Sequence, residues 1–158
     1  MTAALRIIPD RCTGCMQCEL ACSWAKTGEF KPSSSLIRVH VFDEEASYAP
    51  YTCLQCEEAW CMTVCPTNAI VTDPVTHAVR VTDSLCIGCH LCTLACPFGT
   101  VFTKPTDGRA AKCDLCDGEP ACVTACPTQA IEFGELQEDG EWFKSWGQKV
   151  SQRYDAAL

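Results

Sequence analysis

The stretch that decides the fold of this chain is Cys86-Ile87-Gly88-Cys89-His90-Leu91-Cys92-Thr93-Leu94-Ala95-Cys96-Pro97, which reads C-x2-C-x2-C-x3-C-P. Its first three thiolates are spaced closely enough to wrap a short loop around one metal cluster. We expect the fourth cysteine to open a helix that points away, so that it suits a different cluster. Pro97 should stop the loop, because its φ is fixed.

Three further quartets complete the sixteen cysteines of the 158-residue chain. The first quartet repeats the same spacing, with Ser23 in place of the proline, and the second and fourth have a longer third spacing followed by proline: Cys12, Cys15, Cys18 and Cys22; Cys53, Cys56, Cys61 and Cys65; Cys113, Cys116, Cys122 and Cys126. So high a cysteine content indicates that disulfides or metals, rather than a hydrophobic core alone, hold a small fold together.

Metal clusters are favoured over the two alternatives, disulfides and zinc. The first residues carry no secretory signal and no apolar run has the length of a membrane span, so we expect a cytoplasmic protein, where disulfides are rare. Zinc sites usually combine a C-x2-C pair with a distant second pair, whereas here each quartet fits within 14 residues. Two quartets have the complete ligand run of a [4Fe–4S] cluster. The sequence therefore predicts four [4Fe–4S] clusters with all sixteen cysteines as ligands.

The chain is acidic, with a formal net charge of −8 and a pI of about 4.8. Nucleic-acid binding is not expected, because no basic patch is available. The charge serves solubility or, as a sharper hypothesis, attracts a partner that has a basic docking face.

The segments around the quartets predict short strands and two helices. We expect strands at residues 4–10, 36–42 and 130–133, and a hairpin over residues 67–81 that turns at Asp73-Pro74. The first quartet should continue as a helix until Gly28. Residues 140–158 have an amphipathic pattern with an aromatic stripe, and this helix would pack either on its own lobe or on a partner subunit.

The four quartets must form two pairs, because in two-cluster ferredoxins each quartet gives three ligands to one cluster and its fourth to the partner cluster. The second and third quartets are separated by a single hairpin, and the strands outside the first and fourth would pair with each other. This favours nested lobes of α+β class: an outer ferredoxin-like lobe of residues 1–48 and 97–139 around an inner lobe of residues 49–96. Sequential pairing, first with second and third with fourth, is the rival.

Nested pairing predicts one ligand set for each cluster. Cluster one takes Cys12, Cys15, Cys18 and Cys126; cluster two takes Cys53, Cys56, Cys61 and Cys96; cluster three takes Cys86, Cys89, Cys92 and Cys65; cluster four takes Cys113, Cys116, Cys122 and Cys22.

Across residues 5–133 the four quartets resemble the four-cluster ferredoxin subunits of molybdenum and tungsten oxidoreductase complexes, the dimethyl sulfoxide reductase iron–sulfur subunit family. Residues 30–39 also resemble that family's link between the first quartet and the inner lobe. The resemblance implies nested pairing and a catalytic molybdenum- or tungsten-cofactor partner subunit. Within the family, the nearest likeness is the small iron–sulfur subunit of bacterial tungsten aldehyde oxidoreductases, which implies anaerobic metabolism.

The sequence predicts an electron relay rather than an enzyme. If all sixteen cysteines bind iron, no iron keeps an open position, and the few histidines offer no nucleophile–base pair; His90 should pack or hydrogen-bond near a cluster. Ile87, Leu91, Leu20 and Leu115 should shield the clusters from water. The relay would connect the catalytic subunit with a flavoprotein or ferredoxin, and exposed clusters at both ends would let protomers self-associate. Alternatives are a free, diffusible ferredoxin, a subunit of a hydrogenase or formate dehydrogenase, and a structural or regulatory metal protein.

Overall fold

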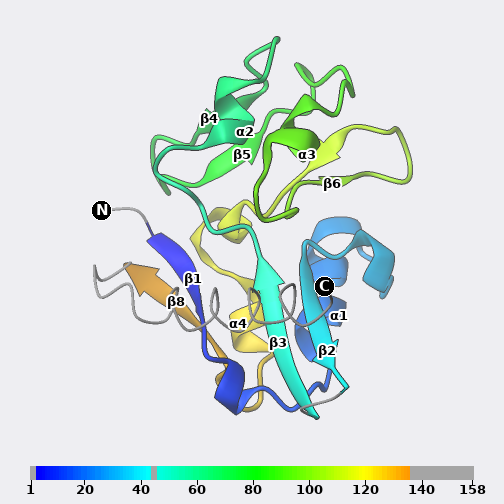
Figure 1. Ribbon diagram of the computed structural model, residues 1–158, viewed down its shortest axis with the longest axis vertical. Coiled ribbons are helices and arrows are strands. Elements are labelled where there is room, and N and C mark those ends of the chain that lie inside the picture. The colour runs from blue at the N-terminus through cyan, green and yellow to red at the C-terminus, as the bar shows by residue number, and fades with distance from the viewer. Residues whose placement is uncertain (1–2, 44–45, 136–158) are drawn as a thin grey trace, which may run out of the picture.

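The computed structural model describes residues 3–43 and 46–135 (Figure 1). Its helices and strands alternate as the predicted mixed class requires. In chain order they are β1 (Ala3–Ile7), α1 (Gln17–Thr27), β2 (Ile37–Phe42), β3 (Ser47–Thr52), α2 (Trp60–Thr63), β4 (Ile70–Thr72), β5 (Val79–Val81), α3 (Leu91–Ala95), β6 (Phe102–Thr103), β7 (Ala110–Ala111), α4 (Ala121–Thr124) and β8 (Ile131–Glu135), with 3-10 turns at Pro9–Arg11, Pro32–Ser34 and Leu115–Gly118.

The two ends of the described chain are joined by the antiparallel pair β1 and β8. Leu5 lies opposite Phe133 and Ile7 opposite Ile131. Both partners were expected as strands, and their pairing is confirmed. β1 ends before Pro9 because that proline opens a 3-10 turn, which leads directly to the first cysteine.

The hairpin predicted for residues 67–81 is also present, as β4 and β5 around the turn at Asp73. Three strands escaped the sequence analysis: β3, which pairs along its whole length with β2, and the short pair β6 and β7. β3 is the longest of them. It contains Pro50, a residue that is uncommon in strands because proline cannot donate to a ladder. In a two-stranded sheet, however, each strand has an open edge, so Pro50 can lie opposite Val39 without breaking the pair.

Proline also sets the length of the helices that carry cysteines. α2, α3 and α4 each contain about one turn and stop near a Cys-Pro step. α1 has Ser23 in place of that proline, so it continues past the cysteine and is 11 residues long in total. α1 ends, as predicted, at Gly28, which adopts φ +70°. The expectation that Cys96 opens a helix is wrong: α3 ends there, and Cys96 has the extended backbone that a following proline favours.

The buried side chains form two hydrophobic cores, and the elements that carry them form a lower and an upper group in Figure 1. The lower core joins the strands β1, β2 and β8 to α1, and its largest buried side chains include Leu5, Ile37, Leu115 and Ile131. The upper core packs the second and third quartets around Ile70 and Val79. Val101 and Ala110 also belong to the upper core. The packing therefore places them with the inner quartets, whereas the boundary expected at residues 96 and 97 assigns them to the outer lobe.

Within residues 3–43 and 46–135, no helix combines the length and the hydropathy of a transmembrane segment. The amphipathic helix expected at residues 140–158 lies outside the described residues.

Candidate metal centres

All sixteen cysteines lie in the described part of the chain, and all are free thiols. The disulfide alternative therefore does not apply to this structure. Among the described residues, no three Cys, His, Asp or Glu side chains converge on a point where they could share a single metal ion.

The four quartets share one backbone feature. The residue just before the second cysteine has a positive φ in every quartet: +69° at Gly14, +52° at Gln55, +70° at Gly88 and +60° at Leu115. A left-handed residue in such a loop turns successive backbone N–H groups toward one side and forms an anion-binding nest, as at many iron–sulfur sites. The repeated conformation fits an anionic cluster in each loop.

Two of these four positions are not glycine, although a positive φ is unfavourable for other residues. Gln55 and Leu115 hold it because they are among the most buried side chains of the protein, 1% and 0% exposed. Gly14 is needed for a second reason. A Cβ atom there would lie 2.6 Å from the Tyr48 ring, so β3 presses directly on the first cysteine loop.

The structure brings cysteines of the first and fourth quartets together. Burial raises the pKa of Cys12, and the neighbouring thiolates of Cys15 and Cys126 add to the effect. Burial likewise raises the pKa of Cys122, with further contributions from Cys113 and Cys22. Cys126 thus lies near the first quartet and Cys22 near the fourth.

The second quartet lies beside a cysteine of the third. One cavity is lined by Cys53, Cys56, Cys61 and Cys96, together with the side chain of Lys112. The pKa of Cys61 is raised to about 11, chiefly by burial; the thiolates of Cys53 and Cys96 contribute to the rise, and Lys112 opposes it. Cys65 packs with Cys86 and Cys96 against the core that contains Cys92.

A further contact connects the fourth quartet with the second and the first. Burial raises the pKa of Cys113 to about 12, and the thiolates on both sides of it, Cys53 and Cys22, contribute. Cys122 similarly has Cys18 of the first quartet among its neighbours. The thiol groups therefore form a continuous series through the molecule.

The fourth cysteine of each quartet accepts hydrogen bonds. Backbone N–H groups of Ala69 and Ala130 donate to Cys65 and Cys126 at 3.3 and 3.2 Å. Threonine hydroxyls also lie within hydrogen-bonding distance of three of these sulfurs: Thr67 at 3.7 Å from Cys65, Thr100 at 3.5 Å from Cys96 and Thr128 at 3.7 Å from Cys126. Toward a metal-bound thiolate, only the hydroxyl can donate.

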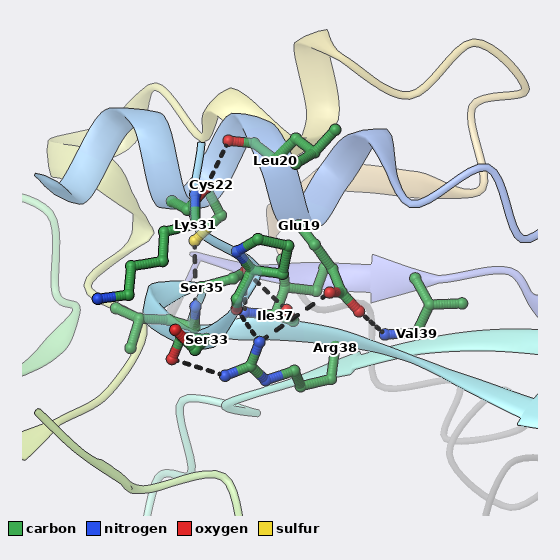
Figure 2. Close-up of polar contacts among 12 residues, drawn as sticks. Glu19, Leu20, Cys22, Lys31, Ser33, Ser35, Ile37, Arg38 and Val39 are labelled. Atoms are coloured by element: carbon green, nitrogen blue, oxygen red, sulfur yellow. Dashed lines mark hydrogen bonds and ion pairs between the residues drawn. The ribbon is translucent and has the colours of Figure 1, made fainter. Parts of the chain in front are cut away.

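These hydrogen bonds reverse the effect of burial. Burial alone would raise the pKa values of Cys65, Cys96 and Cys126, but the threonine hydroxyls and backbone N–H groups stabilise the thiolates and lower all three. Cys22 differs, because α1 continues past it. Its sulfur accepts an N–H from Leu36 at 3.3 Å, beside the contacts that join α1 to β2 through Glu19 and Val39 (Figure 2).

Exposure separates the cysteines into two groups. Cys15 and Cys89 are exposed, and every other cysteine is buried or half-buried. Leu115 is fully buried and Leu20 half-buried, but the expected shielding by Ile87 and Leu91 is wrong, since they are 67% and 44% exposed. Both belong to the short loop and helix of the third quartet, which is too small to cover its own apolar side chains. His90 lies within hydrogen-bonding distance of Thr103, with 3.3 Å between its Nδ1 and the threonine hydroxyl, and its influence on a cluster stays a prediction.

Three kinds of site residue were missed from the sequence. The repeat Cys-Pro-Thr-x-Ala at residues 65–69 and 126–130 signals the threonine hydrogen bonds and could have been noticed. Gln55 and Lys112 give no such signal, because only the fold shows that their polar groups are buried beside the cysteines.

Together, the mixed fold and four cysteine loops define a ferredoxin-like iron–sulfur protein. Comparison with known proteins gives the family. Residues 44–136 match the 4Fe-4S dicluster domain, and residues 5–23 match a 4Fe-4S binding domain. The chain belongs to the 4Fe-4S dicluster domain family, and its sixteen cysteines fit four [4Fe–4S] clusters.

Two relatives and one solved structure illustrate the likeness. The polyferredoxin-like subunit of aliphatic sulfonate oxidoreductase from Pyrococcus furiosus is 42% identical over 120 residues, 76% of this chain and 69% of the relative. The thiosulfate reductase electron transfer subunit PhsB of Salmonella typhi is 36% identical over 163 residues, 93% of this chain and 82% of the relative. A chain of the active site complex BamBC of benzoyl coenzyme A reductase with benzoyl-CoA is 25% identical, with a TM-score of 0.52 over 95% of this chain and 89% of that one.

Other matched relatives are much longer. The chain spans 31% and 20% of two of them. Iron–sulfur electron transfer is thus the common element of the named relatives, while the reactions in their names differ.

Proposed function

We propose that this protein is a non-catalytic electron-transfer subunit that relays single electrons through four [4Fe–4S] clusters. Its ligand sets are the nested ones: cluster one with Cys12, Cys15, Cys18 and Cys126; cluster two with Cys53, Cys56, Cys61 and Cys96; cluster three with Cys86, Cys89, Cys92 and Cys65; cluster four with Cys113, Cys116, Cys122 and Cys22. An outer ferredoxin-like lobe would then enclose an inner one in the sequence.

The observation that carries the proposal is the series of neighbouring thiols. Cys126 neighbours Cys12, and Cys22 neighbours Cys113 and Cys122, as nesting requires. The cavity lined by Cys53, Cys56, Cys61 and Cys96 has the composition proposed for cluster two. Sequential pairing would instead need the fourth cysteine of the first quartet beside the second quartet.

The same contacts support one order for the proposed relay. Cys18 neighbours Cys122, and Cys113 neighbours Cys53, so cluster one leads to cluster four and then to cluster two. The third quartet supplies Cys96 to cluster two, which leads to cluster three. The two exposed cysteines, Cys15 and Cys89, belong to the clusters at the two ends of this order. Electrons can enter and leave there, while the intermediate clusters are covered.

The partners follow from this geometry and from the relatives. One end would receive or deliver electrons at a catalytic subunit with a molybdenum or tungsten cofactor, for which an aldehyde oxidoreductase is the proposed identity. The other would contact a flavoprotein or ferredoxin. Relatives named as subunits of aliphatic sulfonate oxidoreductase and thiosulfate reductase support a subunit role. Since both ends are exposed, a second copy of the chain could also extend the relay.

Two measurements test the proposal. The purified chain should contain about sixteen iron and sixteen sulfide per polypeptide, and zinc with little iron would contradict it. Native purification should recover a complex that contains tungsten or molybdenum. A chain that purifies alone with all its clusters would instead be a diffusible ferredoxin.

A further inference from the structure

Lys112 is the one buried cation among the residues that the structure describes, with 4% of its surface exposed. It lies between β7 and Cys113, and its Nζ donates a hydrogen bond to the carbonyl oxygen of Val79. The backbone N–H of Val79 is bonded in turn by the Gln55 side chain at 2.8 Å. Both contacts fix the ammonium at the boundary between the two cores.

No carboxylate in the described part of the chain forms an ion pair with Lys112, although lysines near it have such partners. Lys26 pairs with Asp114 at 2.5 Å, and Lys104 pairs with Asp83. A buried charge without a compensating charge is strongly unfavourable. Lys112 does face a group of potential anions, because it lines the same cavity as Cys53, Cys56, Cys61 and Cys96.

Lys112 also forms a wall of a second, larger cleft that opens to solvent beside Lys26, Arg80 and Phe102. It therefore stands between that cleft and the cysteine cavity. In this position its charge is shielded from bulk water on the side that faces the cysteines, so its field there is stronger than that of a surface lysine.

We propose that the Lys112 ammonium raises the midpoint potential of cluster two above those of the other three clusters, so that an electron in the relay rests at the junction of the two cores. The inference depends on the cluster-two ligand set proposed above. On one-electron reduction, a [4Fe–4S] cluster with four thiolates changes its charge from −2 to −3. A nearby fixed cation stabilises the more negative state and thereby raises the potential, without any proton transfer.

Among the other proposed ligand sets in the described part of the chain, Cys116 of cluster four also has a lysine beside it, Lys26, but the charge of that lysine is compensated by Asp114 at 2.5 Å. The sulfurs of Cys65 and Cys126 accept hydrogen bonds from a hydroxyl and a backbone N–H, and that of Cys22 accepts one backbone N–H. The proposed cluster two has the hydroxyl of Thr100, which is 2% exposed, near Cys96, and the buried ammonium in addition. Both act in the same direction, because each stabilises negative charge on the sulfur ligands.

The test is a redox titration of the complete chain, followed by electron paramagnetic resonance, with iron counted in every sample. Lys112→Met should lower one of the four midpoint potentials and leave the other three. Lys112→Gln should lower the same midpoint, because it can keep the hydrogen bond to Val79 but not the charge. Lys112→Arg should keep the wild-type value. The affected signal should be the one that Cys56→Ser perturbs.

Lys104→Met is the matched control, since it removes the same charge from a lysine beside the same cleft that is compensated by Asp83. It should shift no midpoint comparably. If Lys112→Met loses iron, the comparison of Lys112→Gln with Lys112→Arg decides. Full iron content with unchanged midpoints in Lys112→Gln would overturn this inference alone, whereas a wild-type chain without four clusters would overturn the proposed function.

Discussion

The side-chain amide of Gln55 joins two segments that are far apart in the sequence. Its Nε2 donates a 2.7 Å hydrogen bond to the carbonyl oxygen of Cys113, and its Oε1 accepts a 2.8 Å hydrogen bond from the backbone N–H of Val79. The second quartet, the hairpin β4–β5 and the fourth quartet are thereby held together at one residue, where the two cores meet.

Replacing Gln55 by Leu should therefore destabilise the protein markedly. Two buried backbone groups would lose their partners, at a cost of about 1–3 kcal/mol each. The free energy of unfolding, or the midpoint of thermal cluster loss followed by visible absorbance, should fall accordingly. Gln17→Leu is the control, because Gln17 is exposed on α1. Equal effects of the two substitutions would show that the Gln55 contacts contribute little.

Alanine substitutions at Gly14 and Gly28 would distinguish two contributions to the loss of stability: an unfavourable backbone conformation and a steric clash. Both have φ near +70°, but a Cβ would strike the Tyr48 ring only at Gly14, and at Gly28 nothing lies within 4 Å. Gly28→Ala should cost about 1 kcal/mol. Gly14→Ala should cost more by roughly 1–3 kcal/mol and release iron from the first loop. A Gly14→Ala variant as stable as Gly28→Ala would contradict the tight contact of β3 with that loop.

The Thr128 hydroxyl should influence the potential of the cluster that Cys126 binds. Thr128→Val keeps the shape but removes the donor, so the reduced state loses stabilisation and one midpoint potential should fall. Thr128→Ser should restore it. A midpoint that is the same in all three proteins, measured by redox titration with full iron content, would show that the hydroxyl does not donate to the sulfur.

The surface around Cys89 should bind a redox partner. Leu94 is 83% exposed on α3, close in sequence to the exposed Cys89. Leu94→Lys should weaken partner binding about tenfold or more, a factor that corresponds to 1.4 kcal/mol, and leave the iron content unchanged. Val75→Lys is the matched control, since Val75 is 84% exposed in the β4–β5 turn. Calorimetry on the native partner measures both, and equal losses would place the partner elsewhere.

Asp73 provides a prediction on pH. Hydrogen bonds from the N–H groups of Thr76 and Val75, assisted by Arg80, lower the pKa of this carboxyl. Because the folded-state pKa is lowered, the ionised carboxyl stabilises the fold fully at pH values above its unfolded pKa of about 3.9. This stabilisation is lost as the pH falls from there through the folded-state pKa. Asp73→Asn should therefore lower the midpoint of thermal cluster loss by the same amount at pH 7 and pH 5. A penalty that fades between these values would mean that Asp73 titrates higher.

The sequence was sufficient to predict those features that depend on residues close together in the chain. The quartets, the hairpin turning at Asp73, the end of α1 at Gly28 and the two terminal strands all depend on residues close together in the chain. β3 was not predicted, and its Pro50, which is uncommon in strands, is accommodated because the sheet has only two strands.

The structural features that could not be predicted from the sequence depend on contacts between distant segments. Gln55 adopts φ +52° because Val79 and Cys113 hold its side chain, and neither lies within 20 residues of it. Nothing in the sequence distinguishes Lys112 from a surface lysine, and only the fold shows that it donates a hydrogen bond to Val79. Both residues belong to the boundary between the cores, which local pattern does not define.

The pairing of β1 with β8 has a consequence for biosynthesis. β1 leaves the ribosome well before its partner strand, which is made only when residues 131–135 have been translated. Cys12 must likewise wait for its neighbour Cys126. The second and third quartets, by contrast, are complete once Cys96 has emerged. Iron–sulfur insertion should therefore proceed from the middle of the polypeptide outward, and the terminal strands should close last, after the inner clusters have been loaded.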